Sequence, residues 1–224
     1  MSESEWAKRR HPRHPIRLPV LYKVTAPAPG KAGVGWTRDL SEGGACLELA
    51  EHLEPMSPLK LVLRTDKGSL EVEAEVVWAA RPDPAGRAAL HGVGFTHLTG
   101  EHQKALHDLL TNKGHTRLEG CRLPLELPVL CRPKGMTDPI LRGRTSDVSR
   151  GGLLLLLPEV LPPGSALEIT IQTARGKVEA EGMIAWVGSA EDQTPGGLVR
   201  HGFKFTDISW PNQMTLGLLL AEIP

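Results

Sequence analysis

The chain is short of aromatic residues, cysteines and net charge, and each shortage argues against a class of function. Lysine plus arginine and aspartate plus glutamate both total 26 in 224 residues, so no overall field attracts a nucleic acid. Five Trp, three Phe and one Tyr leave few rings on which bases could stack. The three cysteines have no C-x-x-C spacing and are odd in number, which argues against a disulfide framework and the usual zinc motifs.

Long apolar runs are also missing. Leu153–Leu157 and Leu216–Ala221 are the longest, far below the ~20 residues that a membrane-spanning helix needs. The N-terminus is polar and has no signal-peptide pattern. We therefore expect a cytoplasmic protein without membrane insertion. No catalytic triad, phosphate loop or carboxylate pair suited to hydrolysis stands out, so we expect neither an enzyme nor a cofactor or metal.

Positive charge is concentrated near the N-terminus. Residues 8–17, called the arm below, contain five Lys or Arg, two His and no acid. Pro12 and Pro15 keep this segment extended rather than helical. An extended basic arm ahead of the first strand can fold over a domain and meet an anion there.

A six-residue motif shows that the chain is a duplicated module. Asp39–Gly44 has the sequence Asp-Leu-Ser-Glu-Gly-Gly, and its second copy, Asp147–Gly152, lies 108 residues further along. Other matches at offsets of 108 to 110 are Pro19 with Pro128, Trp78 with Trp186, and His91 with His201. We therefore expect two domains, residues 1–113 and 114–224.

Short strands separated by turn residues dominate each copy. Leu70–Val76 alternates apolar and acidic residues, as a half-buried strand does. Lys67-Gly68 and Arg175-Gly176 are expected hairpin turns, and 19 prolines and 24 glycines suit a turn-rich fold. About six strands are expected in each copy, with Trp78 and Trp186 in the core.

A helix is expected at the end of each copy. The first can start at Thr99 or Gly100. Its apolar stripe consists of Ala105, Leu106, Leu109 and Leu110. Ser209 is the expected cap of the second, with Met214, Leu218 and Leu219 facing inward. The fold class is therefore mainly β: two tandem six-stranded antiparallel β-barrels, each with a C-terminal α-helix.

The repeated motif predicts a turn between two strands. Its Asp39 carboxylate and Ser41 hydroxyl can hydrogen-bond local backbone amides, and Gly44 can adopt a positive φ. Taken alone, the pattern favours a structural role.

The arm ahead of the first copy favours an anion site. Arg9 and Arg13 have R-x-x-x-R spacing with Arg10 between them. Arginine binds phosphates and the O6 and N7 atoms of guanine with its planar fork, and it also stacks on the ring. A nearby carboxylate can accept hydrogen bonds from the guanine N1 and N2 donors. The pattern thus predicts a guanine nucleotide with two phosphates and more than one base.

Together, the arm and the motif resemble the PilZ domain, a family of bacterial receptors for cyclic di-GMP. The family pattern is R-x-x-x-R in an N-terminal arm followed by [D/N]-x-S-x-x-G. Here it reads Arg9–Arg13 and Asp39–Gly44. The strands around Trp78 and Gly92–Phe95 also resemble the family's later strands, and the similarity covers nearly the whole chain in two copies.

The resemblance implies a ligand and its site. The implied binding residues are Arg9, Arg10 and Arg13, which would clasp the bases and phosphates of cyclic di-GMP, above a floor formed by Asp39, Ser41 and Gly44. Binding in the family often takes two intercalated ligand molecules, and the arm closes over them as a switch. Charge-assisted bonds contribute ~1.5–3 kcal/mol each, so loss of Arg9 or Arg13 should weaken binding at least about tenfold.

The second copy departs from the pattern in its arm. With Arg122 aligned to the last arginine of the first arm, Leu118 and Glu119 stand where the other two arginines should be. Arg117 lies one residue out of register, and an acid in an anion site is repulsive. The second, weaker candidate site consists of Arg117, Arg122, Asp147, Ser149 and Gly152. We expect this domain to serve structure or partner binding.

Three functions are weighed. The first is a receptor whose arm and interdomain arrangement change when cyclic di-GMP binds, and which signals to an unidentified protein partner in motility, polysaccharide or related output. The second is a PilZ-type adaptor that binds protein but no ligand. The third, nucleic-acid binding through residues 8–17, is disfavoured because the chain is neutral and poor in aromatic residues.

Overall fold

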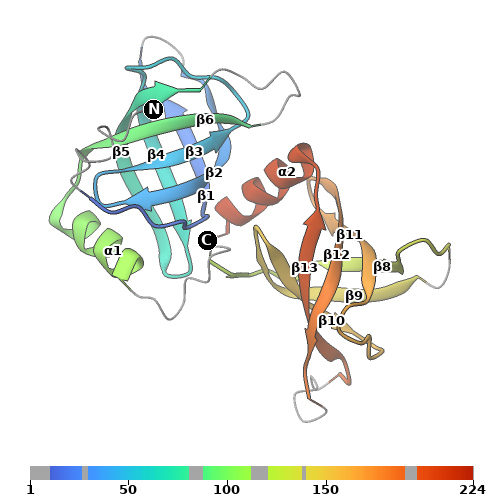
Figure 1. Ribbon diagram of the computed structural model, residues 1–224. Coiled ribbons are helices and arrows are strands. Elements are labelled where there is room, and N and C mark those ends of the chain that lie inside the picture. The colour runs from blue at the N-terminus through green and yellow to red at the C-terminus, as the bar shows by residue number, and fades with distance from the viewer. Residues whose placement is uncertain are drawn as a thin grey trace, which may run out of the picture. The chain divides into compact units, whose positions relative to one another are not determined.

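Two barrels make up the fold. The computed structural model describes residues 11–26, 30–80, 88–111, 121–137, 140–189 and 196–223. The chain divides into two compact units, one reaching to Cys121 and the other beginning at Arg122 (Figure 1). The expected boundary between residues 113 and 114 lies outside the described residues and stays a prediction.

The first barrel consists of six antiparallel strands, ordered β1-β2-β3-β6-β5-β4 around a closed sheet. The strands are β1 (Pro19–Val24), β2 (Ala32–Ser41), β3 (Gly44–Leu49), β4 (Pro58–Thr65), β5 (Gly68–Ala79) and β6 (Ala89–His97). Before β1, the arm pairs with β2 through the bridge between His14 and Leu40. The closed barrel places the end of the arm beside the β2–β3 turn.

The second barrel repeats this topology. Its sheet order is β10-β13-β12-β11-β8-β9, and pairing of β10 with β9 closes it. The strands are β8 (Pro128–Pro133), β9 (Leu141–Ser149), β10 (Gly152–Leu157), β11 (Ala166–Thr173), β12 (Gly176–Val187) and β13 (Val199–Asp207). A two-residue strand, β7 (Leu123–Pro124), pairs with β9 where the first domain has the His14 bridge. The predicted fold class is confirmed.

The cores follow the alternation in the sequence. In β5 the apolar residues of Leu70–Val76 are buried, while Glu71 and Glu73 are exposed. The hairpin turns occur where predicted, with Gly68 at φ 123° and Gly176 at φ 118°. Cys46 lies buried in its strand as a free thiol.

A helix follows each barrel: α1 (Gly100–Thr111) and α2 (Trp210–Ala221). Thr99 caps α1 and Ser209 caps α2, since each accepts a hydrogen bond from a backbone amide three residues on. Neither helix is long and apolar enough to cross a membrane, as far as the described residues show.

The predicted inward face of α2 is wrong. Leu216 and Leu220 are the fully buried leucines, in place of Met214, Leu218 and Leu219. Almost every residue of the last two turns is apolar, so hydrophobicity alone does not fix the rotation of the helix. Polar contacts at its start help to fix it, because the Asn212 side chain donates to the Glu179 carbonyl at 2.9 Å.

Two equivalent buried histidines join a loop to each barrel. His91 Nε2 accepts a hydrogen bond from the Leu53 amide at 2.9 Å, and its Nδ1 lies 3.1 Å from the Ala89 carbonyl. His201 repeats both contacts in the second barrel. One neutral tautomer satisfies both bonds, and burial lowers the pKa of both imidazoles. The two histidines therefore bond the backbone in the same way in each barrel.

Candidate functional site

The repeated motif forms the turn between β2 and β3. The Ser41 hydroxyl donates a hydrogen bond to the Gly44 carbonyl at 3.0 Å and is 5% exposed. We expected this hydroxyl to bond a backbone amide, and that expectation is wrong. The side chain closes the turn across a tight hairpin, so it shapes the local backbone.

Gly44 is required for a different reason than the one expected. Its φ is not positive. A Cβ at this position would lie 2.2 Å from the Val93 carbonyl oxygen on β6. The glycine therefore allows β3 and β6 to approach each other closely at the point where their pairing begins.

The arm meets the turn through Arg13. Its Nη1 donates to Asp39 Oδ1 at 2.6 Å, and both side chains are 27% exposed. Asp39 thus pairs with a guanidinium rather than with the local amide that we expected. Backbone bonds between His14 and Leu40 at 2.8 and 2.9 Å fix the chain directly after Arg13. Arg9 and Arg10 lie outside the described residues.

Buried Thr37 holds the arm to the barrel as well. Its hydroxyl donates to the Ile16 carbonyl at 2.6 Å and accepts from the Leu18 amide at 2.7 Å. The end of the arm that carries Arg13 is therefore part of the folded domain.

A row of four paired residues crosses the barrel wall from the turn. Asp39 pairs with Cys46, Cys46 with Gly92, and Gly92 with Trp78, across strands β2, β3, β6 and β5. Burial raises the pKa of Cys46 to about 11, so it lies in the row as a neutral thiol. A Cβ on Gly92 would lie 1.9 Å from the Trp78 Nε1 atom, so the indole lies directly against this glycine.

The expectation that Trp78 belongs to the core is wrong. The ring is 43% exposed on the outer surface. A β-bulge between Val76 and Trp78 shifts the alternation by one residue, which turns Val76 and Ala79 toward the core and Trp78 outward. Trp186 is 41% exposed beside a bulge at the same place in β12.

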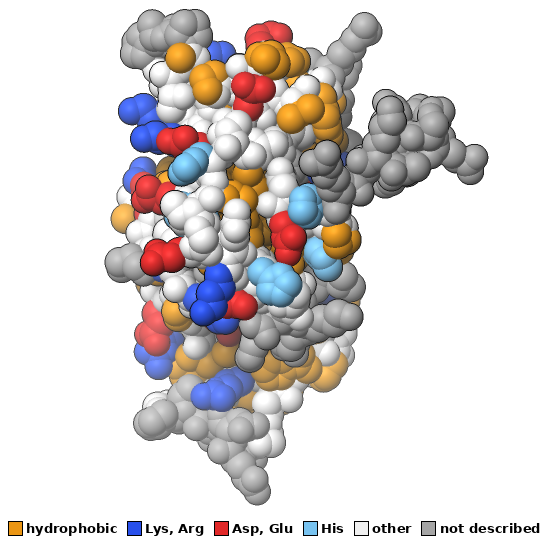
Figure 2. All heavy atoms as spheres, turned by 90° about the vertical axis from the view of Figure 1, so that its left-hand side faces the viewer, with side chains coloured by type: hydrophobic (Ala, Val, Ile, Leu, Met, Phe, Trp, Pro, Cys, Tyr) orange, Lys and Arg blue, Asp and Glu red, His pale blue; other side chains and the backbone are white. Residues whose placement is uncertain are grey.

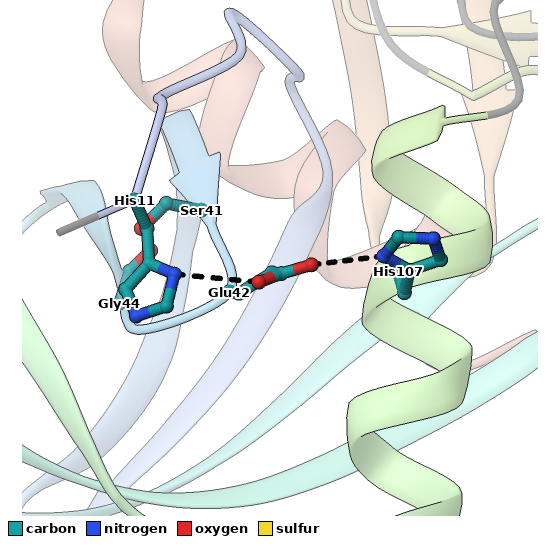
Figure 3. Close-up of polar contacts among 5 residues, drawn as sticks. All are labelled: His11, Ser41, Glu42, Gly44 and His107. Carbon is teal, nitrogen blue, oxygen red and sulfur yellow. Dashed lines mark hydrogen bonds and ion pairs between the residues drawn. The ribbon is translucent and has the colours of Figure 1, made fainter.

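Glu42 was not predicted as part of the site. One carboxylate oxygen lies 2.9 Å from His107 Nδ1 of α1, and the other lies 3.3 Å from His11 Nδ1 of the arm (Figure 3). The hydrogen bond from His107 is the main reason that the pKa of Glu42 lies below its usual value. Because His107 is 65 residues away in the sequence, no local pattern could have indicated this contact.

A comparison with models of protein families identifies the family. The model described as the PilZ domain matches residues 7–112 and again residues 116–222. The chain belongs to the PilZ family. PilZ domains are typically receptors for cyclic di-GMP and are usually non-catalytic. No curated protein matches the chain.

The solved structures to which the chain is similar share little sequence with it. The inhibitor of motility MotI/DgrA of Bacillus subtilis is 10% identical, with coverage of 92% of this chain and 95% of that one and a TM-score of 0.37. MrkH of K. pneumonia is 12% identical, covering 90% and 84%, with a TM-score of 0.39. YcgR of Escherichia coli, solved in complex with c-di-GMP, is 14% identical, covering 91% and 82%, with a TM-score of 0.37.

The second PilZ domain repeats the described motif contacts. Arg122 Nη1 donates to Asp147 Oδ1 at 2.7 Å, and the Ser149 hydroxyl donates to the Gly152 carbonyl at 3.0 Å. A Cβ on Gly152 would lie 2.2 Å from a carbonyl oxygen of β13. Arg117 lies outside the described residues. The described parts of the two candidate sites therefore have the same geometry.

Two residues beside the motif differ between the PilZ domains. Leu154 replaces Cys46 in the row across the barrel. Arg150 replaces Glu42 and bonds Gln213 of α2 at 3.3 Å. The residue after the motif serine thus contacts the C-terminal helix in both domains, with opposite charge.

The coloured side chains in Figure 2 include both signs of charge. Among the side chains coloured there, Lys and Arg alternate with Asp and Glu, and His lies beside acids. The described charges of this face therefore suit a local anion site better than a long polyanion.

Proposed function

We propose that the first PilZ domain is a receptor for cyclic di-GMP. The observation that carries this proposal is the pairing of Arg13 with Asp39 at the edge of the motif turn, in an arm whose sequence also contains Arg9 and Arg10. The pair places a guanidinium, partly exposed, where the arm leaves the barrel. The proposed binding residues are Arg9, Arg10, Arg13 and Asp39.

Pairing with Asp39 orients Arg13 before a ligand arrives. One Nη1 donor contacts the carboxylate, and a guanidinium has five N–H donors in a rigid fork. A pre-oriented fork loses less conformational entropy when it binds a phosphate or the guanine O6 and N7 edge. Ser41 and Gly44 contribute indirectly, because their side-chain hydroxyl and missing Cβ fix the turn that carries Asp39.

Trp78 offers a second surface for the ligand. It lies three strand spacings from Asp39 along the row, or about 14 Å at ~4.8 Å per strand. An exposed indole can stack on a nucleobase and gain roughly 1–3 kcal/mol. A ligand with two bases could thus contact the arm with one and the indole with the other.

Ligand binding is proposed to move the arm and to change the arrangement of the two domains, which a protein partner then detects. Partner processes of this kind are motility and polysaccharide output. We place the protein in the cytoplasm, where PilZ proteins generally act. Two intercalated ligand molecules per site are the proposed stoichiometry, and the second domain is a weaker candidate site.

Calorimetric titration with cyclic di-GMP tests the assignment. We expect binding by the parent chain and a loss of at least about tenfold for Arg13→Ala. Arg122→Ala is the matched control, since it removes the equivalent pair from the second domain. Absence of binding heat in the parent chain would refute the receptor, and a loss with Arg122→Ala alone would assign the site to the second domain.

The adaptor function is favoured by one observation. In both domains the serine and glycine of the motif are used within the fold, so the motif persists without any ligand. An adaptor predicts that Arg13→Ala leaves partner binding unchanged, while the receptor predicts that ligand-dependent partner binding is lost. Pull-down with and without cyclic di-GMP distinguishes the two.

A further inference from the structure

Glu42 connects three segments that are distant in the sequence. Its carboxylate contacts His11, two residues before Arg13 on the arm, and His107 on α1 (Figure 3). The carboxylate itself belongs to the motif turn between β2 and β3. All three side chains are about half exposed, at 43%, 43% and 59% for His11, Glu42 and His107. Each can therefore exchange protons with solvent.

Packing also holds His11 in place. A Cβ on Gly43 would lie 3.0 Å from the His11 Cδ2 atom. The imidazole therefore lies against the bare backbone of the turn, in a space that a side chain at Gly43 would crowd. The contact with the Glu42 carboxylate and the packing against Gly43 both place the arm beside the turn.

The second domain makes the corresponding connection without a titratable group. Arg150 occupies the position of Glu42 and bonds Gln213 of α2. Arginine and glutamine keep their charge states across the physiological pH range. The first domain alone joins turn and helix by a carboxylate and an imidazole.

The neighbouring elements carry other charged and titratable groups. In the described part of the chain they are Arg13, His14 and Arg17 on the arm, Arg38 and Asp39 on β2, Glu48 on β3, His91 and His97 on β6, and Glu101, His102, Lys104 and Asp108 on α1. Four of these residues are histidines, and His91 is buried within the barrel. No three His, Cys, Asp or Glu side chains in the described part of the chain are grouped so as to hold a metal ion.

We propose that Glu42, His11 and His107 form a proton-sensitive link that raises the affinity of the first domain for its anionic ligand as pH falls. The ligand in this proposal rests on the proposed function. With both imidazoles neutral the three groups carry a charge of about −1, and with both protonated about +1. A negative cluster beside the turn repels an anion, whereas a positive one attracts it and holds the arm against Glu42. By linkage, ligand binding takes up protons.

The decisive measurement is the affinity of the full chain for cyclic di-GMP at pH 7.5 and pH 5.5, at constant ionic strength. For the parent chain we expect affinity to rise about three- to tenfold toward pH 5.5, since the charges are exposed and screened. The double variant His11→Gln/His107→Gln should bind like the parent at pH 7.5 and gain less than about twofold at pH 5.5. His97→Gln, which removes an imidazole outside the link, should keep the parental response. A double variant with the full parental response would overturn the proposal.

A ligand-free measurement separates failure of the link from failure of the ligand assignment. The Glu42 carboxyl can be titrated by NMR, and its pKa, lowered mainly by the His107 hydrogen bond, should return toward the ordinary value in the double variant. Identical Glu42 titration in parent and variant would overturn the link, whatever the ligand. A third outcome is no cyclic di-GMP binding at either pH together with the expected change in the Glu42 pKa. It would overturn the proposed receptor function and the effect of the link on ligand affinity. The contact of Glu42 with the two histidines would still be established.

Discussion

The steric requirement at the motif glycine leads to a quantitative prediction for Gly44→Ala. The new Cβ would lie 2.2 Å from the Val93 carbonyl oxygen, whereas Cβ atoms essentially never approach other atoms closer than 3.0 Å. β3 must therefore move away from β6 where their pairing begins. Overpacking costs about 1–3 kcal/mol, and a weakened ladder bond costs a further ~0.5–1.5 kcal/mol. We expect the free energy of unfolding of the first domain to fall by about 1.5–4.5 kcal/mol.

Each domain provides its own control. Gly100 has no atom within 4 Å of a built Cβ, and neither does Gly196 in the second domain. Alanine at either position should change stability by less than about 0.5 kcal/mol. Gly152→Ala should reproduce the effect of Gly44→Ala, since its Cβ would also lie 2.2 Å from a carbonyl oxygen.

Urea unfolding followed by NMR is the suitable assay, because resolved signals report each barrel separately and the two need not unfold in one transition. The reasoning would be refuted if Gly44→Ala and Gly100→Ala unfolded with free energies within about 0.5 kcal/mol of each other.

Three further predictions concern stability and the exposed indole. Met56 is 72% exposed and has a left-handed backbone conformation with φ 67°, where the second domain has Gly164 at φ 89°. Because glycine adopts this conformation without strain, Met56→Gly should stabilise the first domain by about 0.5–1 kcal/mol in urea unfolding. Burial lowers the pKa of His91, so the imidazole binds a proton more readily in the unfolded chain than in the folded one. The contribution of His91 to the free energy of unfolding should be full above about pH 6.5 and should decline as pH falls through that value. Urea unfolding at several pH values should show a smaller decline for His91→Gln. Gly92→Ala should displace the Trp78 ring, so the NMR signal of its indole N–H should shift while that of the second domain's equivalent indole stays.

The sequence predicted the barrels because two signals reinforce each other. Alternation in Leu70–Val76 indicates a half-buried strand, and the recurrence of the whole pattern shows that the unit is one domain long. Turn positions followed from Gly68 and Gly176, whose positive φ values only glycine adopts easily. These features depend on local chemistry, which a single sequence displays directly.

Features that depend on register or on distant contacts could not be predicted in the same way. Strict alternation of side chains along β5 would turn Trp78 inward together with Val76. Only the bulge after Val76 turns Trp78 outward. Gly44 suggests a positive φ, but its constraint comes from Val93 on a strand that is distant in the sequence. The contact between Glu42 and α1 likewise exists only because the barrel brings the turn to the helix.

The two domains show that the D-x-S-x-x-G motif is not by itself a mark of ligand binding. Ser41 and Gly44 have the same structural tasks as Ser149 and Gly152, and the arginine–aspartate pair is present in both domains. Selection for the fold alone would therefore preserve the motif.

Differences in binding must come from groups beside the motif. Arg150 gives the second turn a positive charge where Glu42 gives the first a negative one, so turn charge alone would favour the second domain for an anion. The arm acts in the opposite direction, because only the first has Arg9 and Arg10 ahead of its paired arginine. Each charge-assisted phosphate bond contributes about 1.5–3 kcal/mol, more than a screened charge on an exposed turn does. The arm should therefore outweigh the turn, and the first domain should be the one that binds ligand.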